Sequence, residues 1–453
     1  MPLSPQAYRP TTKLLDLGPD FWDPVRAAEF PQTVLRYRND RAAAEVGLDA
    51  LTAEEWLGHF GRFDPLPGSL PEPLALRYHG HQFRSYNPDI GDGRGFTAAQ
   101  LYDDRGRLMD LGTKGSGRTP YSRFGDGRLT LKGGVREILA TEMLEALNVP
   151  TSRTLSLVET GEALERGDEP SPTRSAVMVR LSHGHLRIGT FQRLAYLQDE
   201  ANMRRLVDYA LRELYGEEPG EDPAVRLLDL AVDRTARLAA RYMAAGFVHG
   251  VLNSDNINIT GESFDYGPWR FAPSWDVGFT AAYFDHAGLY SFGRQPEAIH
   301  WDLFQLAGSL RLVAESDPLL AVLERFGPRF QAHVADALLW RLGLEPRGEA
   351  EDRALVQALE RTLRDTGVEL HRFFHHAFAR PLPDGYGEAW SEFRSLAAAY
   401  RPRKERPAWF DGEPCGMLID EVEAIWAPIA ERDDWAPLRA KLEQVRAMGE
   451  ALA

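Results

Sequence analysis

Lysine is scarce in this sequence, and one lysine opens a basic, glycine-rich stretch. Of the 52 basic residues only five are lysines. Lys114 begins Lys114-Gly115-Ser116-Gly117, and from there to Arg136 six basic residues face a single acidic one, Asp126. A second glycine cluster, Gly91-Asp92-Gly93-Arg94, lies upstream. Glycines let backbone N–H groups approach an anion closely, and each cluster brings its own cation. The pattern predicts a phosphate site, with a solvated loop as the alternative.

A second group of residues, further along the sequence, contains one histidine and side chains whose oxygen atoms could bind a metal. The run from His249 to Asn256 can be aligned with the H-R-D-L-x-x-x-N catalytic loop of protein kinases. Asp265-Tyr266-Gly267 then stands where kinases have D-F-G. Amide and carboxylate oxygens suit Mg²⁺, so Asn256 and Asp265 are the candidate metal ligands. Glu137, 23 residues after Lys114, matches the helix glutamate that pairs with a kinase strand lysine.

One position departs from the kinase pattern. The aspartate that accepts the proton in H-R-D falls on Val251, which cannot accept one. Asp255 lies directly before Asn256 and could replace it. Two interpretations stay open on this ground: a catalytically inactive pseudokinase, or an enzyme with a rearranged base.

Strands and one helix must position the first set of residues, and a long helix followed by a loop and two short strand-like pieces must position the second. A hairpin turn at 103–106 separates two strand-like runs, and a helix over 133–148 ends before Val149-Pro150. Further strands are predicted at 154–159, 175–181, 257–260 and 263–266. A long helix is predicted over 224–245, with mostly helical chain from 301 and a linker at 401–414 before a terminal helix.

The common nucleotide signatures are absent. A Walker P-loop needs Gly-Lys, and the sequence has no such dipeptide. Gly91-Asp92-Gly93-Arg94-Gly95 continues with Phe96 and has no βαβ context, which argues against a Rossmann site.

Composition limits the class of protein further. The net charge of −15 argues against nucleic acid as the main partner, because phosphate neutralisation needs surplus Lys and Arg. No apolar run is long enough for a membrane span, and no secretory signal is visible at the start. We therefore expect a cytoplasmic monomer of two or three packed units that binds neither membrane nor nucleic acid.

The ordered motifs together resemble the selenoprotein O (YdiU) family of kinase-like protein nucleotidyltransferases. The resemblance runs from about Tyr78 to about Gln295 and more loosely beyond. The markers are Tyr78-His79-Gly80-His81-Gln82-Phe83, Asn87-Pro88 with Gly91-Asp92-Gly93-Arg94, Lys114 to Arg123, Arg136-Glu137, His249 to Asn256, Asp265-Tyr266-Gly267-Pro268 and Tyr290-Ser291-Phe292.

The resemblance implies an α+β, protein-kinase-like bilobal fold with an N-terminal extension and a helical C-terminal extension. The expected division is an extension over 1–76, an N-lobe with nucleotide-binding loops over 77–190, a helical C-lobe with catalytic loop and metal site over 191–400, and a linker and helix over 401–453. The implied activity is transfer of AMP from ATP to Ser, Thr or Tyr hydroxyls of protein substrates, with release of pyrophosphate and use of Mg²⁺ or Mn²⁺.

The resemblance also implies a role for each site residue. Asp255 would accept the proton, while Asn256 and Asp265 would hold the metal. Glu137 would orient Lys114. The implied nucleotide-binding residues, counting Glu137 with them, are Gly91, Gly93, Arg94, Lys114, Asp126, Gly127, Glu137, Arg180, Arg187 and Asp265.

The sequence leaves three alternatives to AMP transfer: UMP transfer from UTP, γ-phosphoryl transfer by an atypical kinase, and a nucleotide-sensing scaffold without catalysis. Many members of the family end in a redox pair of cysteine with cysteine or selenocysteine. Cys415 is the single cysteine here, so we expect no such pair in this chain.

Overall fold

An antiparallel sheet of nine strands forms the centre of the protein. The structure is a computed structural model and describes residues 7–167 and 169–453. The strand order is β2-β4-β7-β8-β11-β10-β3, with β1 paired to β7 and β9 to β11. The strands of this sheet are β1 (Arg9–Thr11), β2 (Trp22–Pro24), β3 (Val34–Arg38), β4 (Leu74–Leu76), β7 (Thr97–Tyr102), β8 (Leu108–Lys114), β9 (Leu129–Thr130), β10 (Arg153–Leu164) and β11 (Thr173–Ser182). Two small ribbons pair β5 (Gly80–Gln82) with β6 (Ser85–Asn87) and β12 (Phe247–Val248) with β13 (Arg270–Phe271).

The predicted hairpin at 103–106 is confirmed by the antiparallel pairing of β7 with β8. The carboxylate of Asp103 accepts the backbone N–H groups of Arg105 and Arg107 at 3.0 and 2.8 Å, which fixes the turn. Every residue of β8 is buried, because both faces of the sheet are covered. Met109 and Leu111 pack in a core with helices α1 (Asp40–Glu45) and α2 (Ala53–Gly61). The alternate residues, which include Lys114, face the other way.

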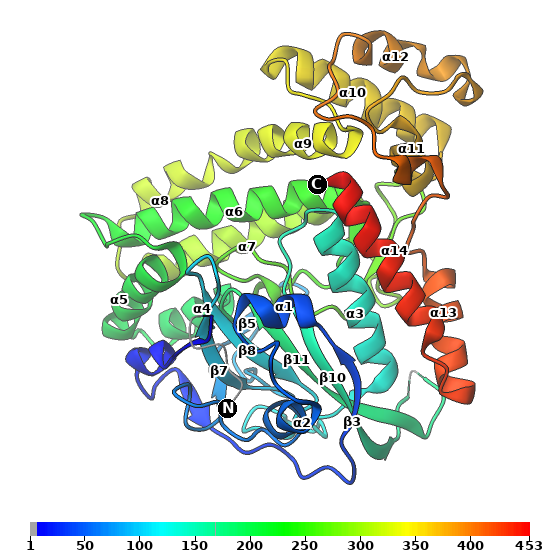
Figure 1. The fold of residues 1–453 in the computed structure, drawn as a ribbon. Helices are drawn as coiled ribbons and strands as arrows, with labels where there is room; N and C mark the ends of the chain where they lie inside the picture. The colour runs from blue at the N-terminus through cyan, green and yellow to red at the C-terminus, as the bar shows by residue number, and fades with distance from the viewer. Residues whose placement is uncertain (1–6, 168) are drawn as a thin grey trace.

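Helix α3 (Leu131–Ala146) covers that other face. The sequence predicts a helix over 133–148, and the helix forms two residues earlier because Thr130 caps it. The Thr130 hydroxyl accepts the backbone N–H of Gly133 at 3.1 Å. Helix α14 (Ala436–Leu452) runs beside α3 (Figure 1). The C-terminal end of the chain thus supports a helix of the sheet region.

Helix α13 (Ile419–Arg432) packs against α3 and α14, and the other remaining helices form a separate layer and a group at one end of the molecule (Figure 1). The long helix predicted over 224–245 is confirmed as α6 (Pro223–Ala245), which packs against α7 (Gln295–Leu310), α8 (Ser316–Leu323) and α9 (Phe326–Leu342). The other helices are α4 (Ile188–Tyr196), α5 (Glu200–Tyr209), α10 (Glu349–Thr366), α11 (Leu370–Ala377) and α12 (Ser391–Ala397). A sheet with helices packed on it confirms the predicted mixture of the two element types.

Two details of the expected fold are wrong. The segments 257–260 and 263–266 form no strand and make only single bridges, Arg187 with Asn258 and Thr151 with Ser263. Asn258 favours a loop because its side-chain amide donates to the carbonyl of Gly184 at 2.7 Å. The predicted terminal helix is two helices, α13 and α14, separated at Asp433, which has a left-handed φ of 57°.

The segment before residue 77 contributes strands to the central sheet. Its described part supplies β1 to β4, and β3 pairs with β10 from Ser156 to Glu159. The division of the chain into an extension and two lobes stays a prediction.

The single cysteine is in the C-terminal region. Cys415 is 3% exposed and belongs to the main core. The ammonium group of Lys441 on α14 lies 3.5 Å from its sulfur atom. Burial raises the pKa of this thiol, with Lys441 acting in the opposite direction.

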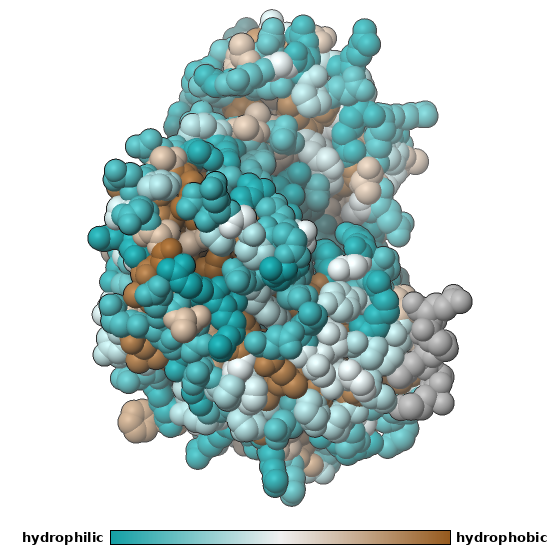
Figure 2. Space-filling model, turned by 90° about the vertical axis from the view of Figure 1, so that its left-hand side faces the viewer, coloured by the Kyte–Doolittle hydropathy of each residue, from teal (hydrophilic) through white to brown (hydrophobic). Residues whose placement is uncertain are grey.

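The surface shown in Figure 2 is mostly hydrophilic, with hydrophobic patches between the polar regions. Large exposed apolar side chains include Phe124, Tyr283 and Phe284. None of the helices in the described ranges combines the length and the hydropathy needed to cross a bilayer.

Candidate active site

A cavity of about 670 Å³ gathers residues that are far apart in the sequence. It lies between the glycine clusters, the ends of β8 and β11, and the loops that carry Asp255 and Asp265. Ten predicted site residues line it: Gly91, Gly93, Arg94, Lys114, Asp126, Gly127, Arg180, Arg187, Asp255 and Asp265. Glu137 is not in the lining because it lies behind Lys114, and Asn256 is not in the lining either.

Lys114 sits at the end of β8 and is held by two carboxylates. Its ammonium nitrogen lies 2.6 Å from Glu137 on α3 and 3.0 Å from Asp265. Lys114 pairs across the strands with Met178, two residues from Arg180 on β11, so both cations project from the same face of the sheet. Arg180 in turn reaches Glu137 at 3.4 Å and Asp265 at 3.5 Å. Two cations therefore share two carboxylates at the floor of the cavity.

Asp265 is kept ionised by this arrangement. Burial raises the pKa of its carboxyl, but Lys114, Arg180 and Arg94 outweigh burial and hold that pKa well below its usual range. Its backbone has a left-handed φ of 61°, which is uncommon outside glycine. A strained residue bearing an ionised side chain in a cavity is typical of a functional position.

Asp255 shows the opposite electrostatic behaviour. It lies in the short 3₁₀ turn Ser254–Asn256, and its Oδ1 atom is buried without a hydrogen-bond partner among the described residues. Burial raises the pKa of this carboxyl to about 6, with Arg187 opposing the shift. Gly80 on β5 packs so tightly against it that a Cβ there would lie 2.9 Å from the Asp255 side chain. The position of this carboxylate is thus fixed by close packing.

Arg187 connects the two halves of the cavity. As the residue before α4, it donates to the carbonyl of Asp255 at 3.2 Å and to the carboxylate of Asp92 at 3.2 Å. Its guanidinium also lies 4.1 Å from the centre of the Tyr78 ring. A buried, forked cation in this place can bind phosphate oxygens.

Two predicted glycines have packing reasons that the sequence did not show. A Cβ at Gly91 would lie 2.5 Å from the ring of Tyr121, so this ring occupies the space of a side chain. Gly127 has a φ of 71°, and a Cβ there would lie 2.2 Å from the carbonyl oxygen of Gly117. Both positions therefore require glycine for the loops to enclose the cavity.

Asp126 is held at the cavity mouth by a residue that sequence reasoning missed. Arg166, from the turn between β10 and β11, donates to both Asp126 oxygens at 2.8 and 3.1 Å. Burial raises the pKa of Asp126, but Arg166 and Arg128 outweigh burial and lower it. Arg166 carries no local motif, so only the folded chain places it in the site. Tyr121, by contrast, belongs to a marker segment already noted in the sequence.

The donor atoms near Asp255 fit a hard divalent cation. The side-chain amide of Asn256 donates to the carbonyl of Val251 at 3.0 Å, which leaves its carbonyl oxygen as the available atom. Together with the ionised carboxylate of Asp265, this gives the oxygen ligands that Mg²⁺ and Mn²⁺ take. The residues present therefore fit the metal implied for the site.

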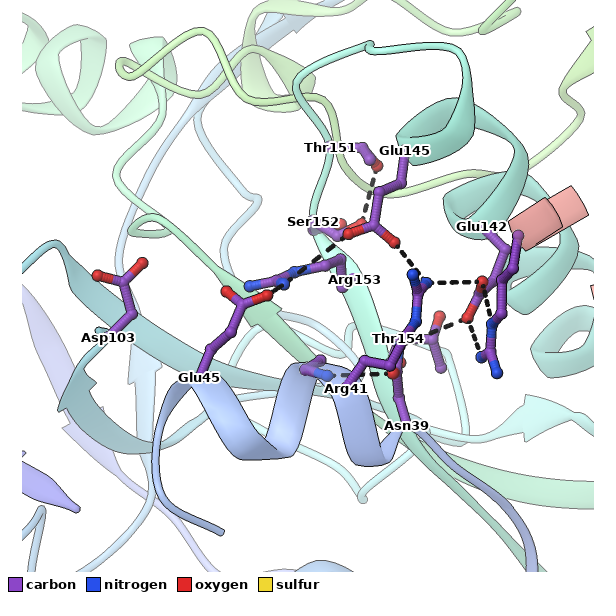
Figure 3. Close-up of polar contacts among 12 residues, drawn as sticks. Asn39, Arg41, Glu45, Asp103, Glu142, Glu145, Thr151, Ser152, Arg153 and Thr154 are labelled. Atoms are coloured by element: carbon purple, nitrogen blue, oxygen red, sulfur yellow. Dashed lines mark hydrogen bonds and ion pairs between the residues drawn. The ribbon is translucent and has the colours of Figure 1, made fainter. Parts of the chain in front are cut away.

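A separate acidic group, Glu45 with Asp103 and Asp104, lies elsewhere on the molecule. Each is already engaged: Glu45 is hydrogen-bonded by Arg153 (Figure 3), Asp103 pairs with Arg107 at 2.7 Å, and Asp104 lies 3.9 Å from Arg105. We therefore assign no metal to this group.

Comparison with known proteins identifies the family of this chain. A family model described as "Protein adenylyltransferase SelO" matches residues 5–385. The chain belongs to the SelO family. The family resemblance found in the sequence is therefore confirmed, and a nucleotidyltransferase enzyme is confirmed at the level of the family.

Relatives of this family match almost the whole chain. A "Protein nucleotidyltransferase YdiU" of Synechococcus elongatus is 43% identical over 471 residues, covering 96% of this chain and 94% of the relative. The protein of the same name from Gloeobacter violaceus is 44% identical over 477 residues, covering 98% and 96%. Among solved structures, a Toxoplasma gondii rhoptry antigen kinase domain matches at 12% identity with a TM-score of 0.30, over 60% of this chain and 84% of that one. That last similarity is too weak to establish a fold.

Proposed function

We propose that this protein transfers AMP from ATP to Ser, Thr or Tyr hydroxyls of protein substrates and releases pyrophosphate. The fold would act as a kinase-like pair of lobes, with the sheet region of 77–190 and the helical region of 191–400 on the two sides of the nucleotide. The family membership and the names of the relatives, protein adenylyltransferase and protein nucleotidyltransferase, support this activity.

The observation that carries the proposal is that one cavity holds both a cluster of cations and a carboxylate of raised pKa. Lys114, Arg94, Arg180 and Arg187 line it together with Asp255. Nucleotidyl transfer needs charge neutralisation on the phosphates and a base for the attacking hydroxyl, and little else from the protein. The cavity contains residues of both kinds.

In this reaction the cations would bind the triphosphate. Arg180 and Arg187 present forked guanidinium groups, and Lys114 presents a point charge that Glu137 keeps in place. Gly91 and Gly93 would let the backbone approach the phosphates, and Asp126 with Gly127 would bound the nucleotide at the cavity mouth.

Asp255 would accept the proton of the protein hydroxyl as that oxygen attacks the α-phosphate. A carboxyl whose burial raises its pKa to about 6 is mostly ionised at neutral pH, yet is a stronger base than an ordinary aspartate. The equivalent of the kinase base is Val251, which leaves Asp255 as the carboxylate available to the hydroxyl.

Asn256 and Asp265 would hold Mg²⁺ or Mn²⁺, whose bound charge would stabilise the departing pyrophosphate. Asp265 meets the requirement that the ligand be ionised, because the neighbouring cations lower its pKa.

The test uses ATP labelled separately on the α and the γ phosphate, with the full chain, Mn²⁺ or Mg²⁺, and a generic protein acceptor. Acceptor labelling from the α position alone is the expected result, and labelling from the γ position alone would show phosphoryl transfer instead. UTP labelled on the α phosphate, run in parallel, decides whether UMP is transferred. Binding of ATP without any labelling would contradict catalysis and favour a nucleotide-sensing scaffold.

A further inference from the structure

A second cavity of about 310 Å³ lies behind the C-terminal end of α3. No residue that lines it also lines the candidate active site. The α3–β10 loop, the turn between β7 and β8, and helix α6 form its walls. In a protein with a net charge of −15, five arginines line this small space: Arg105, Arg107, Arg153, Arg237 and Arg241.

Three of these arginines are matched by carboxylates. Arg107 pairs with Asp103 at 2.7 Å, and Arg105 lies 3.9 Å from Asp104. Arg153 is directed between Glu45 and Glu145, as Figure 3 shows. Their charges are therefore partly or fully neutralised within the protein.

Arg237 and Arg241 are not matched. They lie four residues apart on α6 and so share one face of that helix. Neither side chain forms an ion pair or a hydrogen bond with any residue that the structure describes, although the side-chain atoms Arg237 Nε and Arg241 Nη1 are buried. Burial lowers the pKa of both groups, and so does a neighbouring charge, that of Arg234 for Arg237 and that of Arg237 for Arg241. Two adjacent cations with unpartnered buried donors are an unfavourable arrangement unless an anion joins them.

The carboxylates in the cavity wall do not supply that anion. Glu145 is occupied by Arg41 at 3.0 Å and by Arg153 at 3.8 Å. Glu262 accepts the backbone N–H of His183 at 2.9 Å. Burial raises the pKa of both glutamates. Asp233 acts electrostatically on Arg237, and Asp336 acts on Arg241, but neither carboxylate forms an ion pair with these arginines in the described structure, and Asp233 lies 3.1 Å from His333.

We propose that this cavity is a binding site for a small phosphate-bearing anion, held by Arg237 and Arg241 with Arg105 at its rim. Guanidinium forks match phosphate oxygens in a bidentate manner. The cavity volume lies at the lower end of the roughly 300–1,000 Å³ usual for ligand sites, which suits one or two phosphate groups with little attached. The ligand would also contact the loop after α3, the helix that carries Glu137. This site is independent of the activity proposed for the first cavity.

The test measures hydrogen exchange of the full chain with inorganic pyrophosphate as the probe, without metal and at constant ionic strength. Residues 148–153 and 237–241 report on this cavity, and residues 91–94 report on the candidate active site. The test variant is the double substitution Arg237→Gln with Arg241→Gln. The control is Arg234→Gln, which removes one positive charge from an exposed position of the same helix that does not line the cavity.

Pyrophosphate is expected to protect residues 148–153 and 237–241 in the native protein and in Arg234→Gln. In the double variant the concentration for half-protection should rise at least about tenfold, as expected for the loss of charge-assisted hydrogen bonds. Protection of 91–94 should be equal in all three proteins. Absence of protection at 148–153 in the native protein, or equal protection in the double variant, would overturn the proposal.

A second variant keeps the test decisive if the double variant fails to fold. Arg105 is 68% exposed in its side chain, so Arg105→Gln leaves the core untouched. In this variant the pyrophosphate concentration for half-protection of residues 148–153 should rise severalfold, and the protection of residues 91–94 should not change. Unchanged affinity in Arg105→Gln, in the absence of a folded double variant, would count against the site.

Discussion

Arg446 on α14 donates to both carboxylate oxygens of Glu142 on α3, at 2.6 and 2.9 Å. The hydroxyl of Tyr37 donates to the same carboxylate at 2.6 Å. Glu142 is 3% exposed and lies on the helix that also carries Glu137, the partner of Lys114. The C-terminal helix therefore supports the element that positions the candidate nucleotide-binding lysine.

Replacing Arg446 with methionine should destabilise the protein. The change leaves a buried carboxylate with weaker compensation from Arg41 at 3.2 Å, and we expect a loss of about 1–3 kcal/mol in the free energy of unfolding. Chemical denaturation measures it. Arg439→Met, at an exposed position of the same helix, is the control and should change stability by less than about 0.5 kcal/mol.

The same pair has a pH signature. Burial raises the pKa of Glu142, but the hydrogen bonds from Arg446 and Tyr37 outweigh burial and lower it below the usual range. A carboxyl with a lowered folded pKa stabilises the protein above its unfolded pKa, and this contribution is lost as the pH falls. The stability difference between the native protein and Arg446→Met should therefore shrink in acid. A difference that stays constant with pH would contradict this assignment.

Asp265→Ala should abolish nucleotide transfer. The substitution removes a proposed metal ligand and a partner of Lys114 at 3.0 Å, so we expect a loss of at least about 100-fold in labelling from α-labelled ATP. Asp276→Ala, an exposed aspartate in the same segment, serves as the control. Full activity in Asp265→Ala would refute the metal assignment.

Asp255→Asn should lower activity and raise stability. The amide keeps the shape of the side chain but cannot accept the proton, so we expect a loss of about 10²–10⁴-fold in transfer rate. In the native protein kcat/KM should fall below about pH 6, because burial raises the pKa of Asp255 to about 6 and the protonated form cannot act as a base.

The stability effect of Asp255→Asn follows from the same raised pKa. The pKa of Asp255 is about 4 in the unfolded chain and about 6 in the folded protein. Between these two values the native state binds more protons than the unfolded state, so the stability of the native protein falls as the pH rises. The variant does not titrate there. The stability difference between Asp255→Asn and the native protein should therefore grow over this range and stay constant above it. Thermal unfolding of both proteins at about pH 4 to 8 measures this difference, and a difference that does not grow would contradict the prediction.

Gly91→Ala should weaken nucleotide binding without unfolding the protein. The added methyl would lie 2.5 Å from the ring of Tyr121 and must displace the loop that borders the cavity. We expect about tenfold weaker ATP binding by calorimetry, the cost of about 1.4 kcal/mol. Gly220→Ala, where a Cβ meets nothing within 4 Å, should bind as the native protein does.

The sequence predicts the elements that have strong local signals. The hairpin at 103–106 and the helix α6 follow from turn residues and apolar periodicity, and both are confirmed. The segments 257–260 and 263–266 read as strands by composition, but the hydrogen bonds of Asn258 hold them as a loop. The strands before residue 77 were not predicted, because β1 to β4 are short and join the sheet through distant partners.

In the candidate site, too, residues that belong to sequence motifs could be predicted, and residues placed only by the folded chain could not. Lys114, Glu137 and Asp265 were expected together from their order in the chain, and they lie within hydrogen-bonding distance. Arg166 could not be found this way, because its contact with Asp126 depends on a turn 40 residues away. The orphaned atom of Asp255 likewise becomes visible only when Gly80 is packed against it.

The sole thiol of the chain also provides a built-in reporter. Because Cys415 is buried and lies next to Lys441 of α14, a thiol reagent can react with it only when this region opens. The rate of modification by such a reagent would measure how often α14 detaches from the body of the protein. The same measurement on Arg446→Met would separate local release of the helix from global unfolding, with no label to be engineered.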